Sequence, residues 1–171
     1  MQARGFTLIE LAVVIMIVAI TAAAVTLRLE GPLRRAGMRD VVEAVASFDR
    51  LSRAYAREHD RSVRVVVDTV RGQLVRTDAS SGGVVGAPVK LPPEYRIAKV
   101  WVRGRAAADT QTTIPCSRLG LMPTYALLLH GPGRRRQALL FAGLSGELLR
   151  LDDETELEAI GQAMSSRRDP R

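Results

Sequence analysis

A single carboxylate lies inside an apolar stretch near the start of the chain. Phe6 to Leu29 is interrupted only by Glu10, Arg28 and three threonines, and Leu11 to Leu27 contains no charged residue. A carboxylate at bilayer depth costs about 2.5–3.5 kcal/mol, so it is usually retained where it has a partner. The chemistry that this spacing offers is ion pairing, not catalysis.

The residues able to act as nucleophiles or bases form no catalytic pattern. Gly143-Leu144-Ser145-Gly146 is followed by Glu147, so the G-x-S-x-G nucleophile elbow is not completed and we expect a β-turn. We expect His59 to cap a helix end at the surface and His130 to lie at a hairpin end. Cys116 is expected to be a small buried side chain rather than a reactive thiol. The sequence predicts no catalytic residue and a protein that is not an enzyme.

The residues with metal-binding chemistry do not have the spacing of a metal site. Acidic residues cluster near the C-terminus at Asp152, Asp153, Glu154, Glu156 and Glu158, but they do not match an EF-hand loop. Acids at the start of a short helix, which we expect over Glu154 to Met164, are favoured by the helix dipole. One cysteine and two histidines give no zinc pattern and no intrachain disulfide. We therefore predict no metal and no other cofactor.

A basic run, Gly133-Arg134-Arg135-Arg136, is predicted at the tip of a hairpin. Three arginines there would project into solvent and can contact phosphates without sequence preference. A solvated turn, or a charge contact with a neighbouring subunit, is the alternative interpretation. The net charge of +7 permits nucleic acid, anionic lipid or acidic protein as partners and does not choose among them.

The apolar stretch that positions Glu10 is long enough to cross a membrane. A bilayer core of about 30 Å requires about 20 helical residues, which residues 6–29 supply. Ala22-Ala23-Ala24 would also suit the cleavage site of an ordinary secretory signal, leaving a chain that starts at Val25. Such a signal has no use for Glu10, because an intramembrane carboxylate is costly and usually has a functional partner.

The residues around Glu10 resemble a known motif. Gly5-Phe6-Thr7-Leu8-Ile9-Glu10-Leu11, preceded by a short leader with Arg4, is similar to the type IV prepilin leader. The resemblance implies cleavage after Gly5 by a prepilin peptidase and N-methylation of the new Phe6 amine. It also implies that Glu10 sets the register of the subunit in a filament.

A second helix is expected after a kink at Gly31-Pro32, from about Leu33 to about Arg57. The spacing predicts an apolar stripe of Met38, Val41, Val42, Val45, Phe48, Leu51 and Tyr55. A polar side is predicted at Arg39, Asp40, Glu43, Arg50, Arg53 and Arg57. Asp49 and Arg53 are spaced for an i,i+4 ion pair.

The rest of the chain reads as short strands with turn signals, which predicts an α+β protein with an antiparallel β-sheet or sandwich. The expected strands are Ser62 to Asp68, Gln73 to Thr77, Val84 to Leu91, Tyr95 to Val102, about Thr112 to Cys116, Tyr125 to His130, Gln137 to Ala142 and Glu147 to Leu151.

This order of parts resembles the GspH/FimT group of minor pseudopilins. The resemblance implies a leader at 1–5, a transmembrane or filament-core helix at 6–29, a kink and amphipathic helix at 30–60, a periplasmic β domain at 61–151, and an acidic short helix with a basic tail at 152–171. It implies a single-pass inner-membrane subunit of a type II secretion pseudopilus, with its N-terminus in the cytoplasm. The partners implied are other pseudopilins or pilins, the prepilin peptidase/methyltransferase, inner-membrane lipid and secreted cargo.

The alternative within the same group is a FimT-like minor subunit of a type IV pilus that binds DNA for uptake. In that interpretation the Gly-Arg-x-Arg element would be Gly133, Arg134 and Arg136.

Overall fold

The computed structural model describes residues 15–16, 37–151 and 155–156. The predicted leader, most of the predicted span and most of the C-terminal tail lie outside these ranges. Within them, no helix combines the length and the apolar character that crossing a bilayer requires. The described residues from Asp40 to Leu151 belong to one compact unit.

A helix occupies described residues 37–58, as the apolar periodicity predicts. Val41, Val45 and Phe48 recur at three- and four-residue spacing and are buried. The helix ends in a Schellman motif, in which the amide of Arg61 donates to the carbonyl of Ala56. Asp60 takes the left-handed position of this motif, with φ of 48°.

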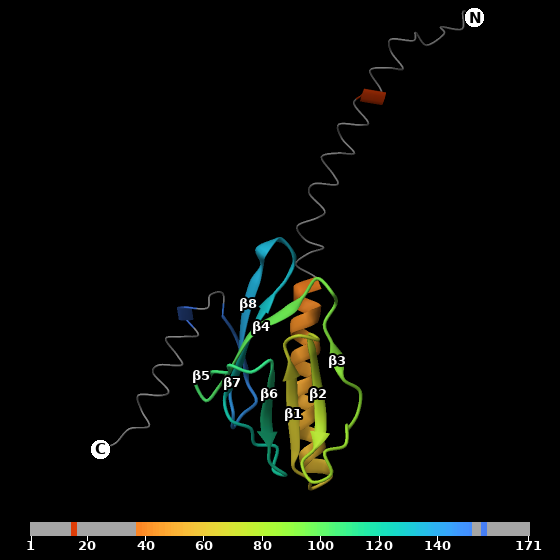
Figure 1. Cartoon of the computed structure of the whole chain (residues 1–171), viewed down its shortest axis with the longest axis vertical. Coiled ribbons are helices and arrows are strands. Elements are labelled where there is room, and N and C mark those ends of the chain that lie inside the picture. The colour runs from red at the N-terminus through yellow and green to blue at the C-terminus, as the bar shows by residue number, and fades with distance from the viewer. Residues whose placement is uncertain (1–14, 17–36, 152–154, 157–171) are drawn as a thin grey trace, which may run out of the picture. The chain divides into compact units, whose positions relative to one another are not determined.

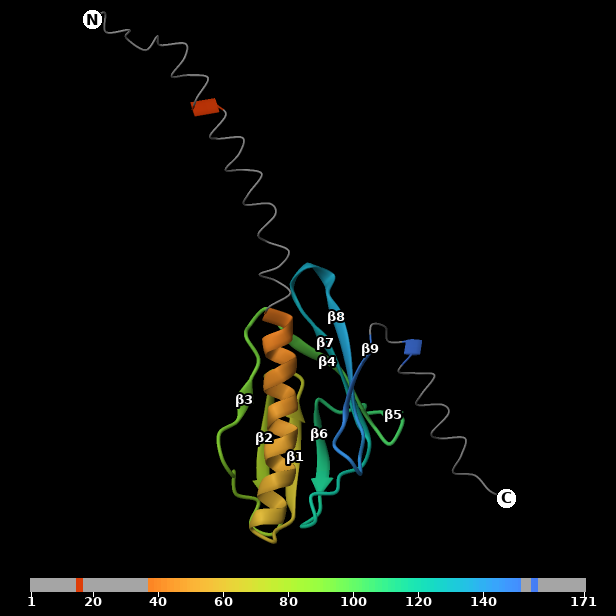
Figure 2. The ribbon, with the colours of Figure 1, turned by 180° about the vertical axis from the view of Figure 1, so that it is seen from behind.

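The first sheet, here called sheet A, has four antiparallel strands in the order β3-β2-β1-β6. They are β1 (Val63–Asp68), β2 (Gln73–Asp78), β3 (Val89–Lys90) and β6 (Gln111–Cys116). The valines at positions 63, 65 and 67 alternate toward the core and are buried. The helix lies against the face formed by β1 and β2, as both side views show (Figures 1 and 2).

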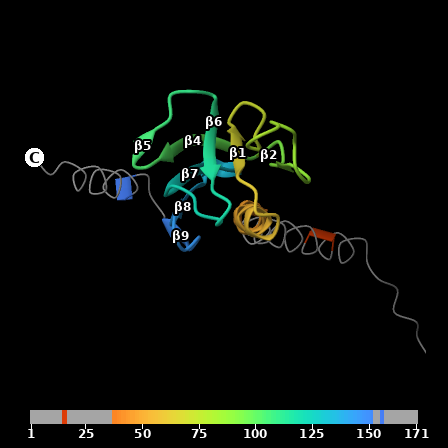
Figure 3. The ribbon, with the colours of Figure 1, turned by 90° about the horizontal axis from the view of Figure 1, so that it is seen from below.

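The second sheet, sheet B, has five antiparallel strands in the order β5-β4-β7-β8-β9. They are β4 (Arg96–Val102), β5 (Arg105–Ala106), β7 (Tyr125–His130), β8 (Arg136–Phe141) and β9 (Leu148–Leu151). A single 3₁₀ turn, η1 (Pro132–Arg134), joins β7 to β8. Figure 3 views the helix nearly along its axis, with strands of both sheets arranged beside it.

The central strand of sheet B is buried on both of its faces. Tyr125, Leu127 and Leu129 are buried on one face, and Ala126 and Leu128 on the other. The second face packs into an apolar cluster with Trp101, Ala138 and Leu140. A strand covered on both sides is apolar without interruption, which explains why its sequence lacks the alternation seen in β1.

The predicted strand over Val84 to Leu91 is wrong for most of its length. Only β3, two residues long, forms there, together with an isolated bridge between Val84 and Thr77. Gly86 has a φ of 73° and Pro88 lacks an amide donor, so the backbone between Val84 and β3 cannot pair regularly. The short strand β5 was not predicted.

Candidate functional site

The three residues with the strongest sequence motif, Gly5, Phe6 and Glu10, lie outside the described residues. Cleavage, methylation and register at these positions therefore stay predictions. The described part of the chain contains, among other features, a buried ion pair between two residues of the helix and a cluster of arginines at one end of sheet B.

The buried ion pair joins two helix residues. Asp49 and Arg53 are 1% and 4% exposed, and 2.8 Å separates Arg53 Nε from Asp49 Oδ2. Tyr125 donates its hydroxyl to Asp49 Oδ1 at 2.8 Å, which links the helix to β7. Both carboxylate oxygens therefore have a donor, as a charge removed from water requires.

The guanidinium of Arg53 also holds two loops through their backbone carbonyls. Its Nη1 donates to Gly143 at 2.7 Å and to Gly120 at 3.3 Å, and its Nη2 donates to Ala142 at 3.3 Å. One side chain thus fixes the helix, the loop before β7 and the loop after β8 in one arrangement.

The glycines of these loops are required by close backbone packing. A Cβ on Gly143 would lie 2.4 Å from the carbonyl oxygen of Met122, and one on Gly120 would lie 2.9 Å from that of Arg53. Gly146 has a φ of 73°, where glycine is unstrained. The segment from Gly143 to Gly146 is a turn, as predicted. Gly143 accepts a hydrogen bond from Arg53, and Gly146 lets the Arg53 side chain pack against the turn.

The helix surface differs from the predicted stripe at two positions. The spacing predicts Arg53 on the polar side, but Arg53 is buried. It predicts Leu51 in the apolar stripe, but Leu51 is 59% exposed. The predicted i,i+4 spacing of Asp49 and Arg53 is confirmed as an ion pair. Periodicity could not show that the pair faces inward, because the carbonyls that receive Arg53 come from loops 67 to 90 residues away in the sequence.

Two aspartates hold the turns at the two ends of β2. Asp68 accepts hydrogen bonds from the amide of Arg71, and to a smaller extent from that of Val70, and these lower the pKa of its carboxyl. Asp78 accepts bonds from the hydroxyl and amide of Ser80 and from Ser81, and these hold the pKa of Asp78 well below its usual range. Both carboxylates are structural.

The contacts of His59 and Cys116 indicate structural roles for both side chains. His59 occupies the C-cap of the helix and stacks on Tyr55 with ring centroids 4.0 Å apart. Cys116 is a free, buried thiol whose pKa is raised by burial. A thiol with a raised pKa is a weak nucleophile near neutral pH. Among the described residues, no three His, Cys, Asp or Glu side chains are grouped for a metal ion.

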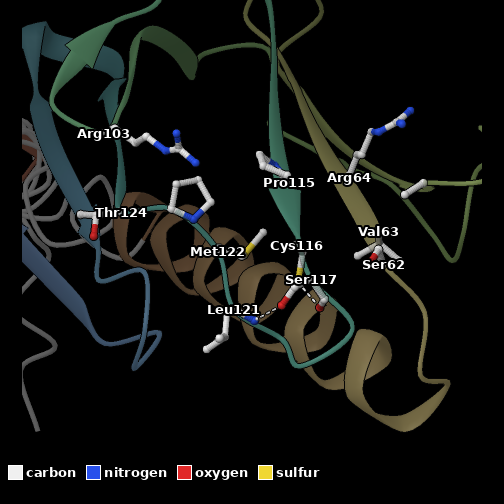
Figure 4. A pocket seen from close by; sticks show the side chains of 12 residues that line it. Ser62, Val63, Arg64, Arg103, Pro115, Cys116, Ser117, Leu121, Met122 and Thr124 are labelled. Carbon is white, nitrogen blue, oxygen red and sulfur yellow. Dashed lines mark hydrogen bonds between the residues drawn. The ribbon is translucent and has the colours of Figure 1, made fainter.

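A cavity of about 660 Å³ opens between the end of β6 and the segment leading into β7. Pro115, Cys116 and Met122 contribute to its lining, and Arg64 and Arg103 lie on either side of Pro115 (Figure 4). This lining is mostly apolar, as in pockets that bind small ligands.

The arginines of the predicted hairpin tip gather with a fourth from β4. Register places Arg96 opposite His130, and His130 opposite Arg136, so the three form one row across β4, β7 and β8. Arg134 and Arg135 follow in the turn, beside a cavity of about 410 Å³. Arg96, Arg134, Arg135 and Arg136 are here called the arginine tip.

The turn holds the arginine tip in a defined backbone conformation. Gly133 and Arg134 both have positive φ, 69° and 60°, and the amide of Gly131 donates to the carbonyl of Arg135. A left-handed arginine is uncommon and costs about 1–2 kcal/mol, so this turn is specified by its surroundings. Gly133, Arg134 and Arg136 are exposed, and Arg135 is partly buried.

Comparison with known proteins gives two matches. Residues 1–26 match the family model described as the prokaryotic N-terminal methylation motif. The fold is similar to the structure of the minor pseudopilin EpsH from the type 2 secretion system of Vibrio cholerae, at 13% sequence identity and a TM-score of 0.52. The match covers 67% of this chain and 95% of that one. A search among curated proteins finds no significant match.

These findings confirm the predicted α+β class. At 13% identity the structural match establishes the fold. The chain has a prepilin-type N-terminal motif and the fold of a GspH-like minor pseudopilin.

Proposed function

We propose that this chain is a minor pseudopilin, a structural subunit of a type II secretion pseudopilus. The observation that supports it most directly is the combination of a methylation motif at residues 1–26 with a fold similar to that of the minor pseudopilin EpsH. In this proposal residues 6–29 anchor the chain in the inner membrane and the β domain lies in the periplasm. The protein acts by assembly with other pseudopilins and performs no catalysis.

Glu10 sets the register of assembly in this mechanism. Cleavage after Gly5 leaves a positive amine on Phe6, four residues before Glu10. In the low dielectric of a helix bundle an unpaired carboxylate is strongly penalised, and pairing with the amine of an adjacent subunit offsets much of that cost. A subunit therefore enters the filament at the depth where the two charges meet.

The buried ion pair transmits the position of the helix to the β domain. Arg53 bonds to carbonyls of two loops, and Asp49 receives the hydroxyl of Tyr125 on β7. These bonds fix the described helix to sheet B, so that this helix and the surfaces of the domain keep one arrangement.

The loops held by Arg53 present apolar surface for a neighbouring subunit or for cargo. Leu119 is 64% exposed and Leu144 is 83% exposed. Each lies next to a glycine whose carbonyl accepts a hydrogen bond from Arg53. Exposed leucines at a fixed position are suited to a protein contact. Replacing both by serine should reduce incorporation into filaments, whereas serine at Val70, which is 76% exposed in another turn, should not.

The N-terminus of the mature chain tests the proposal. Mass spectrometry of the protein from cells with the prepilin peptidase should find a chain that begins with methylated Phe6. A chain that begins at Val25 would instead show an ordinary signal peptide and would refute the proposal.

Assembly is tested separately with Glu10→Gln. Its recovery in sheared filaments should fall sharply while membrane insertion and cleavage persist. Glu43→Gln is the matched control, because Glu43 is an exposed helix carboxylate paired with Arg50. Equal recovery of Glu10→Gln and the control would remove the register mechanism.

A further inference from the structure

We infer that the arginine tip binds phosphate groups of anionic lipid headgroups at the surface of the membrane in which the chain is anchored. This inference rests on the proposed anchoring by residues 6–29. It concerns the subunit before assembly, when its helix is still in the bilayer.

The side chains of the arginine tip are available for an external anion. Arg96, Arg134 and Arg136 are exposed. No carboxylate in the described part of the chain lies within ion-pair distance of any arginine of the tip. The one acid in the lining of the adjacent cavity is Glu94. The described part of the chain thus brings four guanidinium groups together without neutralising them.

Their spacing suits a phosphate. Arg96 and Arg136 flank His130 on adjacent strands, so two strand spacings, about 10 Å, separate their backbones. Two arginine side chains can reach a single phosphate placed between them, and a guanidinium binds phosphate through parallel N–H donors. The fixed turn at Gly133 and Arg134 adds further donors at the edge of the same cavity.

The position of the tip on the domain points to lipid. The β7–β8 turn lies at the same end of the domain as the start of the described helix, near residue 40, in both side views (Figures 1 and 2). Ten residues, 30–39, separate this point from the apolar stretch, and ten residues reach at most about 36 Å. The chain therefore limits the start of the described helix to within about 36 Å of the apolar stretch.

Tethering makes weak phosphate contacts effective. A domain already anchored beside the membrane meets headgroups at high effective concentration. Each arginine near an anionic surface contributes a factor of roughly five to the docked population, and the attraction fades beyond a Debye length of about 10 Å at 0.1 M salt. DNA, the other polyphosphate that arginines could contact, is not tethered to the chain and gains no such effective concentration.

The test uses the full-length chain in lipid nanodiscs and energy transfer from a dye on the domain to acceptor-labelled headgroups. The dye is placed at Pro93→Cys, an exposed position beside the tip, with Cys116 replaced by Ala. A second dye position, Ser145→Cys, reports on the loop between β8 and β9. We expect transfer from position 93 to rise when phosphatidylcholine is replaced in part by phosphatidylglycerol, and to fall back at 0.5 M salt.

The variant Arg96→Ser/Arg134→Ser/Arg136→Ser should lose this rise. The matched variant Arg64→Ser/Arg105→Ser/Arg118→Ser removes the same charge from other exposed positions and should keep it. Equal transfer in neutral and anionic discs, or equal loss in both variants, would overturn the inference. So would loss of double-stranded DNA binding in the tip variant with lipid transfer unchanged. A chain that fails to remain in the nanodisc would instead contradict the proposed anchoring.

Discussion

Asp49 and Arg53 form an ion pair that is enclosed by the domain, although both residues belong to a helix whose adjacent positions Arg50 and Leu51 are exposed. The carboxylate is satisfied by Arg53 and Tyr125, and the guanidinium is satisfied by the carboxylate and three loop carbonyls. The pair connects parts of the chain that local sequence does not bring together.

Removing one partner of this pair should be far more damaging than removing both. Arg53→Met leaves the charge of Asp49 buried without its cation, and we expect the free energy of unfolding to fall by about 3–5 kcal/mol. Asp49→Leu combined with Arg53→Met removes both charges and should recover part of that loss. Urea unfolding of the full chain in detergent, followed through the fluorescence of the single tryptophan Trp101, measures the difference.

Arg50→Met is the matched control for that series. Arg50 pairs with Glu43 on the exposed side of the same helix, with side chains 59% and 60% exposed. An exposed pair contributes less than about 1 kcal/mol. If Arg53→Met were no more destabilising than Arg50→Met, the buried network would not hold the helix to the loops.

Tyr125 should make the protein sensitive to alkaline pH. Burial, together with the charge of Asp49, raises the pKa of Tyr125 well above its ordinary value. The folded state then keeps the phenol proton at a pH where the unfolded chain releases it, so above about pH 10 stability falls by about 1.4 kcal/mol per pH unit. Below that pH the contribution of Tyr125 is fully present.

Tyr125→Phe separates this effect from packing. The variant keeps the ring stacked on Phe141, at a centroid distance of 4.7 Å, and loses the bond to Asp49. We expect it to be about 1.5–3 kcal/mol less stable at pH 7 because a hydrogen bond to a charged group is lost. Its stability should then decline less steeply than that of the wild type between pH 9.5 and about pH 11. If urea unfolding showed that the free energies of unfolding of the wild type and of Tyr125→Phe fall in parallel over this range, the pH dependence would not come from Tyr125.

Gly143 should tolerate no side chain. A Cβ there would meet the Met122 carbonyl oxygen at 2.4 Å and the Thr124 amide nitrogen at 2.7 Å, and backbone atoms cannot rotate away. Gly143→Ala should lower the free energy of unfolding by about 1–3 kcal/mol, as overpacking does. Gly83→Ala is the control, since its nearest atom is the flexible Ser81 Oγ at 3.4 Å. If Gly143→Ala and Gly83→Ala lowered the thermal unfolding temperature equally, the loop around Gly143 would be able to shift, and the prediction would be wrong.

The sequence predicts most of the described elements because their signals are local. Valine alternation predicts β1, and the Gly131-Pro132-Gly133 signal predicts the β7–β8 turn. The strand predicted from Val84 to Leu91 does not form over most of this range. The segment is apolar, but the backbone conformation of Gly86 and the missing amide donor of Pro88 prevent regular pairing. The two-residue strand β5 is too short for any periodicity to reveal.

The arrangement of charged residues was less predictable. The spacing of Asp49 and Arg53 indicates a pair but not its burial, which depends on carbonyls from distant loops. The basic run predicts three members of the arginine tip. Its fourth member, Arg96, joins through strand register, which no local pattern encodes.

Asp78 should make part of the domain's stability depend on acid pH. Hydrogen bonds from Ser80, and then from Ser81, hold the pKa of Asp78 well below its usual range, so its ionised form stabilises the folded state. That contribution is present above the unfolded pKa near 4 and disappears as pH falls through the folded pKa. Asp78→Asn keeps an oxygen for the turn but has no charge at any pH. The stability difference between wild type and Asp78→Asn should therefore be largest at pH 7 and shrink steadily below pH 4 in urea unfolding.

Asp109→Asn changes an exposed aspartate in another loop and controls for the loss of one surface charge. A difference that stays constant from pH 7 to pH 2.5 would mean that Asp78 acts through the shape of its side chain and not through its charge.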